Sequence, residues 1–376
     1  MLVMDDGWFG HRDSDNSSLG DWFVYEKKLK GGLKYLVDEV NKLGMKFGIW
    51  FEPEMISPDS ELYKAHPDWA IQIKGRPLTL CREQYVLDYS RKEVRDHVYG
   101  MMKKILDSAN IEYIKWDMNR QLTEVGSATL PAERQRELWH RYVLGVYDLM
   151  DRLTTDYPHI LLENCSGGGA RFDPGMLYFA PQTWTSDDTD AAEREKIQYG
   201  TSFVYPIVSM GSHVSAVPNH QLHRTTPLST RANVAYFGTF GYELDLNLLS
   251  AKEIEEVKAQ VEFMKEHRDL IQVEGDFYRI LSPFEGNDTA WMVVSRDKKQ
   301  AVAGYYERLN KVNASWMRLR FKGLDEDQLY KVKWEDKCLK AYGNELMYAG
   351  IPVDRDYCNK TNGDFHSVLY TIEAED

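Results

Sequence analysis

Two charged side chains in the segment Ile114–Arg120 have the types and the spacing of a catalytic pair. Lys115 and Asp117 are two positions apart, so in a β-strand they lie on the same face. A neighbouring ammonium favours the ionised form of a carboxylate, and a carboxylate must be ionised to act as a nucleophile. A purely structural Lys–Asp ion pair is the alternative interpretation.

A second acidic segment, Trp184–Asp190, contains Asp187, Asp188 and Asp190. These carboxylates could cap the following helix or bind calcium, but an EF-hand loop is excluded because its required Gly and terminal Glu are absent. Glycoside cleavage needs two carboxylates that come from different strands and face one pocket, one charged and one protonated until it donates. The residues alone do not separate Asp187 from Asp188 in such a role.

Other polar groups support weaker hypotheses. Ser166–Gly169 lacks the Lys-Ser or Lys-Thr of a phosphate loop, so a loop closely approaching a ligand and a flexible connection both fit. Cys165 has no neighbouring His, which favours a packed or ligand-contacting thiol over a nucleophile. His213, His220 and His223 match no HExxH spacing, which favours loop histidines over a metal site.

The elements that would position these residues alternate between short apolar runs and amphipathic helices up to about residue 268, which is typical of βα units. Nearly every predicted strand ends in polar or acidic residues, as expected at the functional end of a (β/α)8 barrel. The seven predicted strands are Leu2–Asp5, Lys46–Phe51, Glu112–Asp117, Ile160–Asn164, Gln182–Thr185, Ile207–Met210 and Phe237–Glu243.

Seven strands are one fewer than a (β/α)8 barrel requires. The chain also starts directly in Leu2–Met4, which has the pattern of a buried strand, so we expect barrel strand one to lie upstream of this sequence. An open doubly wound sheet is the alternative, and no GxGxxG turn supports it.

Four local patterns predict where helices begin or end. These patterns are Gly44 as the residue that follows a helix end, Ser90 with Glu93 and Ser250 with Glu253 as capping boxes at helix starts, and Pro131 as a first-turn proline.

After about Asp269 the pattern changes to period-two alternation. Trp316–Phe321 and Tyr330–Trp334 predict an antiparallel sheet with one solvated face. We therefore predict an α/β protein with a catalytic (β/α)8 barrel over residues 1–270 and a C-terminal antiparallel β-sandwich over residues 271–376.

Composition excludes several classes of partner. The chain has 46 Lys and Arg against 59 Asp and Glu, a net charge of −13, which disfavours nucleic acids and anionic membranes. No apolar run reaches the length of about 18 residues that spans a bilayer. The four cysteines form no CxxC pair, so we expect no disulfide scaffold and a reducing, cytoplasmic compartment. They are Cys81, Cys165, Cys338 and Cys358.

Five motifs together resemble glycoside hydrolase family 36, specifically its bacterial α-galactosidases. The resemblance implies a retaining, double-displacement hydrolysis of terminal α-galactosides such as melibiose, raffinose and stachyose. It also implies that no metal or cofactor takes part and that the parent protein is a homo-oligomer. The motifs lie in order at Met4–Gly10, Gly48–Met55, Tyr113–Arg120, Glu163–Gly169 and Trp184–Asp190.

The resemblance assigns roles to individual residues. Asp117 would be the nucleophile and Asp187 the general acid/base, with about 5–5.5 Å between the two carboxyl groups. Asp5 and Asp6 would accept hydrogen bonds from the galactose hydroxyls on the C4 and C6 side. The remaining implied substrate contacts are Trp50 against the sugar face, Lys115, Arg82 and Asn119 at the hydroxyls, and Cys165 with Gly168 near the C2 hydroxyl.

The sequence departs from the family in one respect. Typical members carry a large N-terminal β-sandwich domain before the first barrel strand, and we expect both to precede this sequence in a longer protein. Two other functions stay open: a galactosyltransferase of raffinose synthesis, which favours a sugar acceptor over water, and a catalytically silent galactose-binding fragment.

Overall fold

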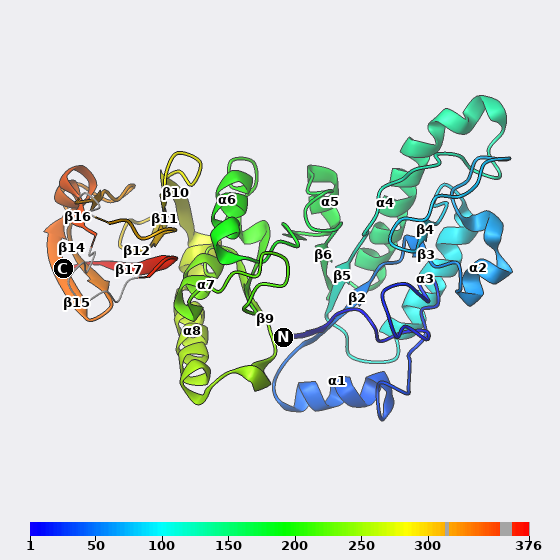
Figure 1. Cartoon of the computed structure of the whole chain (residues 1–376), viewed down its shortest axis with the longest axis horizontal. Helices are drawn as coiled ribbons and strands as arrows, with labels where there is room; N and C mark the ends of the chain where they lie inside the picture. The colour runs from blue at the N-terminus through cyan, green and yellow to red at the C-terminus, as the bar shows by residue number, and fades with distance from the viewer. Residues whose placement is uncertain (313–315, 354–362, 376) are drawn as a thin grey trace. The chain divides into compact units, whose positions relative to one another are not determined.

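The computed structural model describes residues 1–312, 316–353 and 363–375, and its elements are labelled in Figure 1. These residues form two compact units, Met1–Trp184 and Thr185–Asp376. Cys358 lies outside the described residues. The domain boundary expected between residues 270 and 271 stays a prediction.

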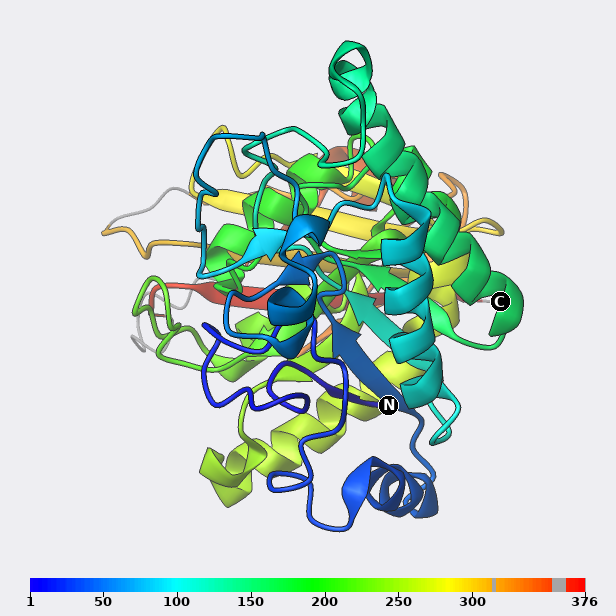
Figure 2. The same cartoon turned by 90° about the vertical axis from the view of Figure 1, so that its right-hand side faces the viewer.

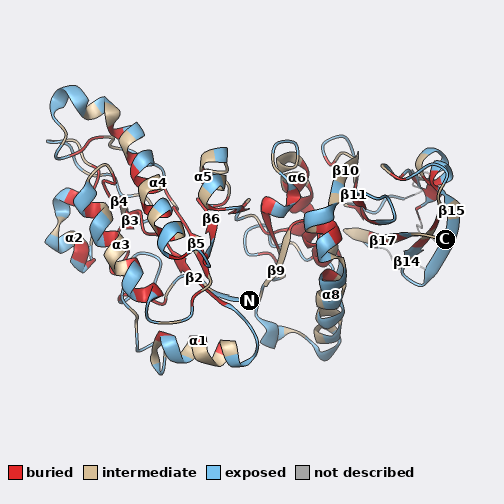
Figure 3. Ribbon diagram, turned by 180° about the vertical axis from the view of Figure 1, so that it is seen from behind, coloured by how far each residue is buried: buried red, intermediate tan, exposed pale blue. Residues whose placement is uncertain are grey.

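A parallel sheet with the strand order β1, β2, β5, β6, β7 forms the centre of the first unit. Trp50 is opposite Lys115, and Lys115 is opposite Glu163, so the ends of three adjacent strands are in register. β2 is buried at every position, as expected for a parallel strand covered on both faces (Figure 3). The strands are β1 (Leu2–Met4), β2 (Phe47–Phe51), β5 (Tyr113–Trp116), β6 (Leu161–Asn164) and β7 (Gln182–Trp184), with a separate antiparallel pair, β3 (Met55–Ile56) and β4 (Tyr85–Val86).

The first strand is less buried than its sequence pattern predicts. Leu2 is 41% exposed and Val3 is 37% exposed. Within the described sheet β1 pairs with β2 alone, so its side chains have strand neighbours on one side. The prediction of a buried strand at Leu2–Met4 is therefore wrong for these two side chains.

Helices of the first unit pack their apolar stripes on this sheet. α3 and α4 lie side by side (Figure 2), and Arg95 on α3 bonds Asp148 on α4 at 2.9 Å. Gly145 in α4 permits the close approach of the segment before α3, because an added Cβ would lie 2.1 Å from the carbonyl oxygen of Tyr89. The helices are α1 (Gly32–Lys42), α2 (Glu61–Ala65), α3 (Lys92–Leu106), α4 (Leu138–Asp156) and α5 (Pro174–Phe179).

Two of the predicted helix boundaries differ from the structure. The Ser90–Glu93 capping box is wrong: α3 starts after Arg91, and the Ser90 hydroxyl bonds Asp88 at 2.5 Å instead. Pro131 precedes a 3₁₀ turn, Ala132–Glu137, and the α-helix starts only at Leu138.

The other two predicted boundaries are confirmed. Gly44 follows α1 with φ +75°, as a residue after a helix end requires. Ser250 and Glu253 form a complete capping box at the start of α8.

The second unit begins with a parallel strand pair and three helices. β8 (Met210–Ser215) pairs with β9 (Thr239–Glu243), and the helices are α6 (Ala191–Thr201), α7 (Leu228–Ala235) and α8 (Ala251–Asp269). The strand predicted at Ile207–Met210 is wrong, because Ile207–Ser209 forms a 3₁₀ turn after Pro206 and the strand starts at Met210. The true strand is rich in small and polar residues, so its apolar signal is weak.

The rest of the second unit is antiparallel, as predicted. Six strands form a sheet in the order β10, β11, β12, β17, β14, β15, and Leu319 and Ile351 from the pair β13 and β16 share its apolar core. The strands are β10 (Gly275–Leu281), β11 (Asp288–Ser295), β12 (Gln300–Glu307), β13 (Arg318–Leu319), β14 (Leu329–Trp334), β15 (Lys337–Tyr342), β16 (Ile351–Pro352) and β17 (His366–Ala374).

Short turns complete the described elements. They are 3₁₀ turns at Pro67–Trp69, Ala132–Glu137, Ile207–Ser209 and Leu246–Leu248, and π turns at Leu270–Glu274 and Glu345–Ala349. Throughout residues 1–312, 316–353 and 363–375, every helix is too short or too polar to cross a membrane.

Candidate active site

Asp117, the first residue after β5, is buried and bonded by N–H donors on both carboxylate oxygens. Its Oδ2 accepts from Trp50 Nε1 at 3.1 Å and from Asn119 Nδ2 at 2.8 Å. Its Oδ1 accepts from the backbone N–H of Met118 at 2.8 Å and from that of Gly167 at 3.5 Å. Such donors stabilise negative charge on a carboxylate, as a nucleophile requires.

Lys115 bonds a different carboxylate from the one that its sequence spacing suggests. Its ammonium lies 2.9 Å from Asp5 Oδ2, so the direct ion pair with Asp117 is not formed. Burial alone lowers the pKa of Lys115, but the negative charge of Asp5 and other acidic groups outweighs burial and raises it above its usual range. The side chain therefore stays a cation at the end of the sheet.

The two acidic residues after β1 have different surroundings. Arg12, which is 3% exposed, holds Asp6 in a two-point contact of 2.5 and 2.6 Å. The Asp5 side chain is 60% exposed and bonds Lys115. Asp6 is thus fixed in place, whereas Asp5 has accessible oxygens. Arg12 has no motif of its own, so sequence reasoning missed it.

Glu52 is a buried carboxyl group beside Asp117 to which sequence reasoning gave no role. It is 1% exposed, and its Oε1 accepts from the backbone N–H of Asn119 at 2.6 Å. Burial first, and then the charge of Asp117, raise the pKa of Glu52 to about 8. Glu52 therefore carries a proton at neutral pH, and Asn119 connects it to Asp117.

This shift predicts a pH dependence of stability that Glu52→Gln removes. Between the ordinary pKa near 4.5 and the shifted pKa of about 8, the folded state holds the proton and the unfolded state does not. The free energy of unfolding therefore falls as pH rises through this window, by on the order of 5 kcal/mol at most. Urea unfolding at about pH 5 and about pH 8 should show this decline in the parent chain and a smaller one in the Gln variant. Equal declines in both proteins would contradict the assignment.

A second buried carboxylate, Glu54, connects four parts of the first unit. It is fully buried and accepts from Trp116 Nε1 at 2.7 Å and from the Tyr142 hydroxyl. Arg171 pairs with it at 2.8 Å and donates to the Ser166 hydroxyl at 2.6 Å. Glu54 thus ties the end of β2 to β5, to α4 and to the loop whose backbone faces Asp117.

We expect Glu54→Gln to destabilise the fold strongly. Removing one charge of a buried pair leaves the other uncompensated, which costs about 3–5 kcal/mol. Glu61→Gln is the matched control, because Glu61 forms an exposed 2.8 Å pair with Lys64 in the same unit. Chemical unfolding should show a large drop for Glu54→Gln and no measurable change for the control. Equal stabilities of the two variants would contradict this prediction.

The Ser166–Gly169 loop folds back on itself near Asp117. The Ser166 N–H donates to the Gly168 carbonyl at 2.7 Å, and Gly168 has a φ of +85°, which favours glycine. Cys165 is 1% exposed, and its N–H bonds the Trp116 carbonyl at 2.7 Å. The loop is therefore a defined turn that brings the Gly167 N–H towards the carboxylate.

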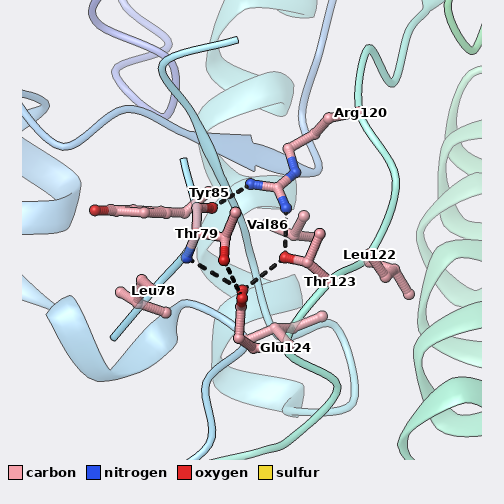
Figure 4. Close-up of a pocket in the computed structure, with 9 residues that line it drawn as sticks. Leu78, Thr79, Tyr85, Val86, Arg120, Leu122, Thr123 and Glu124 are labelled. Atoms are coloured by element: carbon pink, nitrogen blue, oxygen red, sulfur yellow. Dashed lines mark hydrogen bonds between the residues drawn. The ribbon is translucent and has the colours of Figure 1, made fainter. Parts of the chain in front are cut away.

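Arg82 lies in a tight turn, Cys81–Gln84, that Arg120 holds from the side. Arg120 donates to the carbonyl oxygen of Thr79 at 2.9 Å (Figure 4) and to that of Gln84 at 2.6 Å, on either side of Arg82. Arg82 and Glu83 have φ values of +53° and +56°, both left-handed. The Arg82 side chain is about half exposed, and its charge acts to lower the pKa of Glu52. Arg82 is therefore presented near the same strand ends.

A cavity of about 600 Å³ adjoins Asn119 and Gly167. Its wall includes the aromatic side chains of Trp139, Tyr142 and Tyr147. Aromatic faces combined with a few polar groups are a chemistry that suits sugar rings.

The acidic segment after β7 belongs to the second unit, where its aspartates have distinct roles. Asp190 is 2% exposed, accepts from the N–H groups of Ala192 and Glu193 at 3.0 and 3.1 Å, and caps α6. Asp188 accepts from the Asp190 N–H at 3.1 Å. Asp187 is the exposed member of the three. The helix-capping interpretation is correct for Asp190, and the 5–5.5 Å separation between Asp117 and Asp187 stays a prediction.

The three histidines lie on and after β8. His213 Nδ1 is 3.8 Å from Glu243 Oε2 on β9. Across the described ranges, no group of three His, Cys, Asp or Glu side chains is arranged to hold a metal ion.

Comparison with known proteins gives the family. Residues 1–274 match the family model described as Melibiase, and residues 288–372 match the glycosyl hydrolase family 36 C-terminal domain. The chain belongs to glycoside hydrolase family 36. The resemblance seen in its motifs is thereby confirmed.

Curated relatives of this family 36 chain are named α-galactosidases. It is 54% identical over 375 residues to α-galactosidase AgaA of Geobacillus stearothermophilus, covering 100% of this chain and 50% of that protein. It is 50% identical over 376 residues to α-galactosidase Mel36A of Lactobacillus acidophilus, again covering 100% and 50%. The chain thus spans about half the length of the curated relatives it matches.

Solved structures confirm the fold class of this family 36 chain. The crystal structure of AgaA matches with a TM-score of 0.95 at 54% identity, covering 99% of this chain and 51% of that one. The α-galactosidase of Lactobacillus brevis matches with a TM-score of 0.96 at 51% identity, covering 100% and 50%. Variants of AgaA have been solved in complex with raffinose and with stachyose.

Proposed function

We propose that this chain carries the catalytic centre of an α-galactosidase that releases terminal galactose from melibiose, raffinose and stachyose with retention of configuration. The observation that carries the proposal is the buried Asp117, bonded on both oxygens by N–H donors at the end of β5. The AgaA complexes with raffinose and stachyose support the substrate class.

The proposed reaction has two displacements. An oxygen of Asp117 attacks the anomeric carbon while the bond to the leaving sugar breaks, and Asp187 gives its proton to the departing oxygen. Asp187, now a carboxylate, then takes a proton from water as that water attacks the anomeric carbon and the bond to Asp117 breaks. Two inversions give net retention, and every proton has a donor and an acceptor without a metal or cofactor.

The surrounding residues would bind the galactose. Asp5 and Asp6 accept from hydroxyls on the C4 and C6 side, and the Lys115 cation and Arg82 donate to ring hydroxyls. Trp50 and Asn119 have an additional role in this proposal, because their N–H groups orient Asp117 Oδ2. Cys165 and Gly168 would lie near the C2 hydroxyl. The cavity beside Asn119 would accept the rest of the oligosaccharide.

Turnover by this 376-residue chain tests the proposal. We expect it to hydrolyse p-nitrophenyl α-galactoside and to release the α-anomer of galactose first, as NMR would detect. Initial release of the β-anomer would contradict retention. Galactose binding without hydrolysis would favour the silent-fragment alternative, and galactosyl transfer to sucrose in preference to water would favour the transferase alternative.

The environment of the protein is also proposed. A cytoplasmic location and homo-oligomeric assembly of the whole protein stay predictions. The absence of nucleic-acid and membrane partners also stays a prediction, which the acidic composition supports.

A further inference from the structure

A buried arginine holds the segment that carries Asp187. Arg194, in the first turns of α6, is 3% exposed. Its Nε donates to the carbonyl oxygen of Asp188 at 2.8 Å and its Nη2 to that of Ser186 at 2.7 Å. Its Nη1 donates to the Thr185 hydroxyl at 2.5 Å and to the carbonyl oxygen of Gly211 on β8 at 3.1 Å. One guanidinium therefore binds the loop on both sides of Asp187 and ties it to a strand.

These contacts fix the backbone on either side of the proposed acid/base. The Ser186 carbonyl belongs to the peptide group directly before Asp187, and the Asp188 carbonyl belongs to the peptide group between Asp188 and Thr189, so the backbone is held on either side of Asp187. A guanidinium has N–H groups in a rigid planar fork, which Lys cannot reproduce. The rest of the segment is held independently, by Ser215 through the Thr189 carbonyl at 2.8 Å and by the Asp190 cap.

We propose that Arg194 is a positioning residue for general acid catalysis. It holds the backbone of Asp187 so that the exposed carboxyl group reaches the oxygen of the departing sugar. This inference rests on the proposed role of Asp187. Displacement of a catalytic group by about 1 Å can cost roughly 100-fold in rate, so loss of the Arg194 hydrogen bonds should produce a measurable fall in rate.

The test compares two substrates that differ in their need for an acid. Cleavage of melibiose expels glucose through an alkoxide oxygen that needs a proton, whereas the fluoride ion of α-galactosyl fluoride leaves with little help. We expect Arg194→Lys to lower kcat/KM for melibiose about 100-fold and that for the fluoride less than about 5-fold. Arg279→Lys is the matched control: Arg279 donates to the Ser202 carbonyl at 3.0 Å at the opposite end of α6. It should leave the ratio of the two kcat/KM values unchanged.

Equal losses on both substrates in Arg194→Lys would overturn the inference, because a purely structural role does not distinguish leaving groups. Asp187→Asn separates this failure from failure of the proposed function. If Asp187→Asn shows no preference for the fluoride, the acid assignment itself is wrong.

A second measurement does not depend on turnover. Hydrogen exchange of backbone amides over residues 185–190 should become faster in Arg194→Lys and stay unchanged in Arg279→Lys. Unchanged exchange in Arg194→Lys would also overturn the inference, whatever the activity of the chain.

Discussion

Asp117→Gly should abolish hydrolysis of melibiose, lowering kcat by about 10⁴- to 10⁶-fold. The physical reason is that the covalent intermediate cannot form without the carboxylate oxygen. Added azide should restore turnover of an aryl α-galactoside, because the small anion enters the space of the missing carboxylate and attacks the anomeric carbon. The product should be β-galactosyl azide, identified by NMR, since one displacement from this face inverts the configuration.

Asp88→Asn is the control for this prediction. Asp88 is also a fully buried aspartate of the first unit, and it bonds the hydroxyls of Ser90 and Ser127. Its replacement should lower stability while kcat of the folded protein stays within about threefold, since it touches no reacting atom. Residual activity within tenfold of the parent in Asp117→Gly, or an α-configured azide product, would refute the nucleophile assignment.

Asp187→Ala should be the second most damaging change, with a different signature. We expect kcat/KM for melibiose to fall about 10²- to 10⁴-fold, because general acid catalysis contributes on this scale. The loss should be much smaller for aryl galactosides with acidic leaving groups. Azide should here give α-galactosyl azide, because Asp117 is intact and the second displacement restores the original configuration.

Asp188→Asn tests the competing assignment that the residues alone leave open. Asp188 accepts the Asp190 N–H at 3.1 Å and so shapes the loop. Its replacement should weaken activity on all substrates equally. A leaving-group dependence in Asp188→Asn that is absent from Asp187→Ala would exchange the two roles.

The sequence predicts the strands best where apolar runs are short and bounded by polar residues. β2, β5 and β6 begin and end within one residue of their predicted limits. The prediction fails at β8, because four of the six residues of Met210–Ser215 are small or polar, while the apolar pair before it follows a proline and forms a turn. The Ser90–Glu93 pattern fails because Asp88, two residues earlier, competes for the serine hydroxyl.

The sequence predicts which residues gather at the strand ends better than it predicts their partners. Strand periodicity predicts Lys115 and Asp117 on one face, but Lys115 bonds Asp5 instead, and Asp117 is bonded by Asn119, two residues further along the chain. The ion pair between Glu54 and Arg171 joins residues 117 positions apart, and the raised pKa of Glu52 arises from burial. Neither the ion pair nor the raised pKa can be predicted from a short stretch of sequence, because each depends on how neighbouring strands are aligned in the fold.

The turn that carries Arg82 has a consequence for protein engineering. Two adjacent left-handed residues suit a two-residue hairpin, but natural hairpins place Asn-Gly there, and each side chain in this conformation costs about 1–2 kcal/mol. The left-handed conformation of Glu83 therefore lowers the stability of the fold. Thermal stability should therefore rise when Glu83 is replaced by a residue that suits this conformation, while Arg82, the side chain that would meet the substrate, is kept.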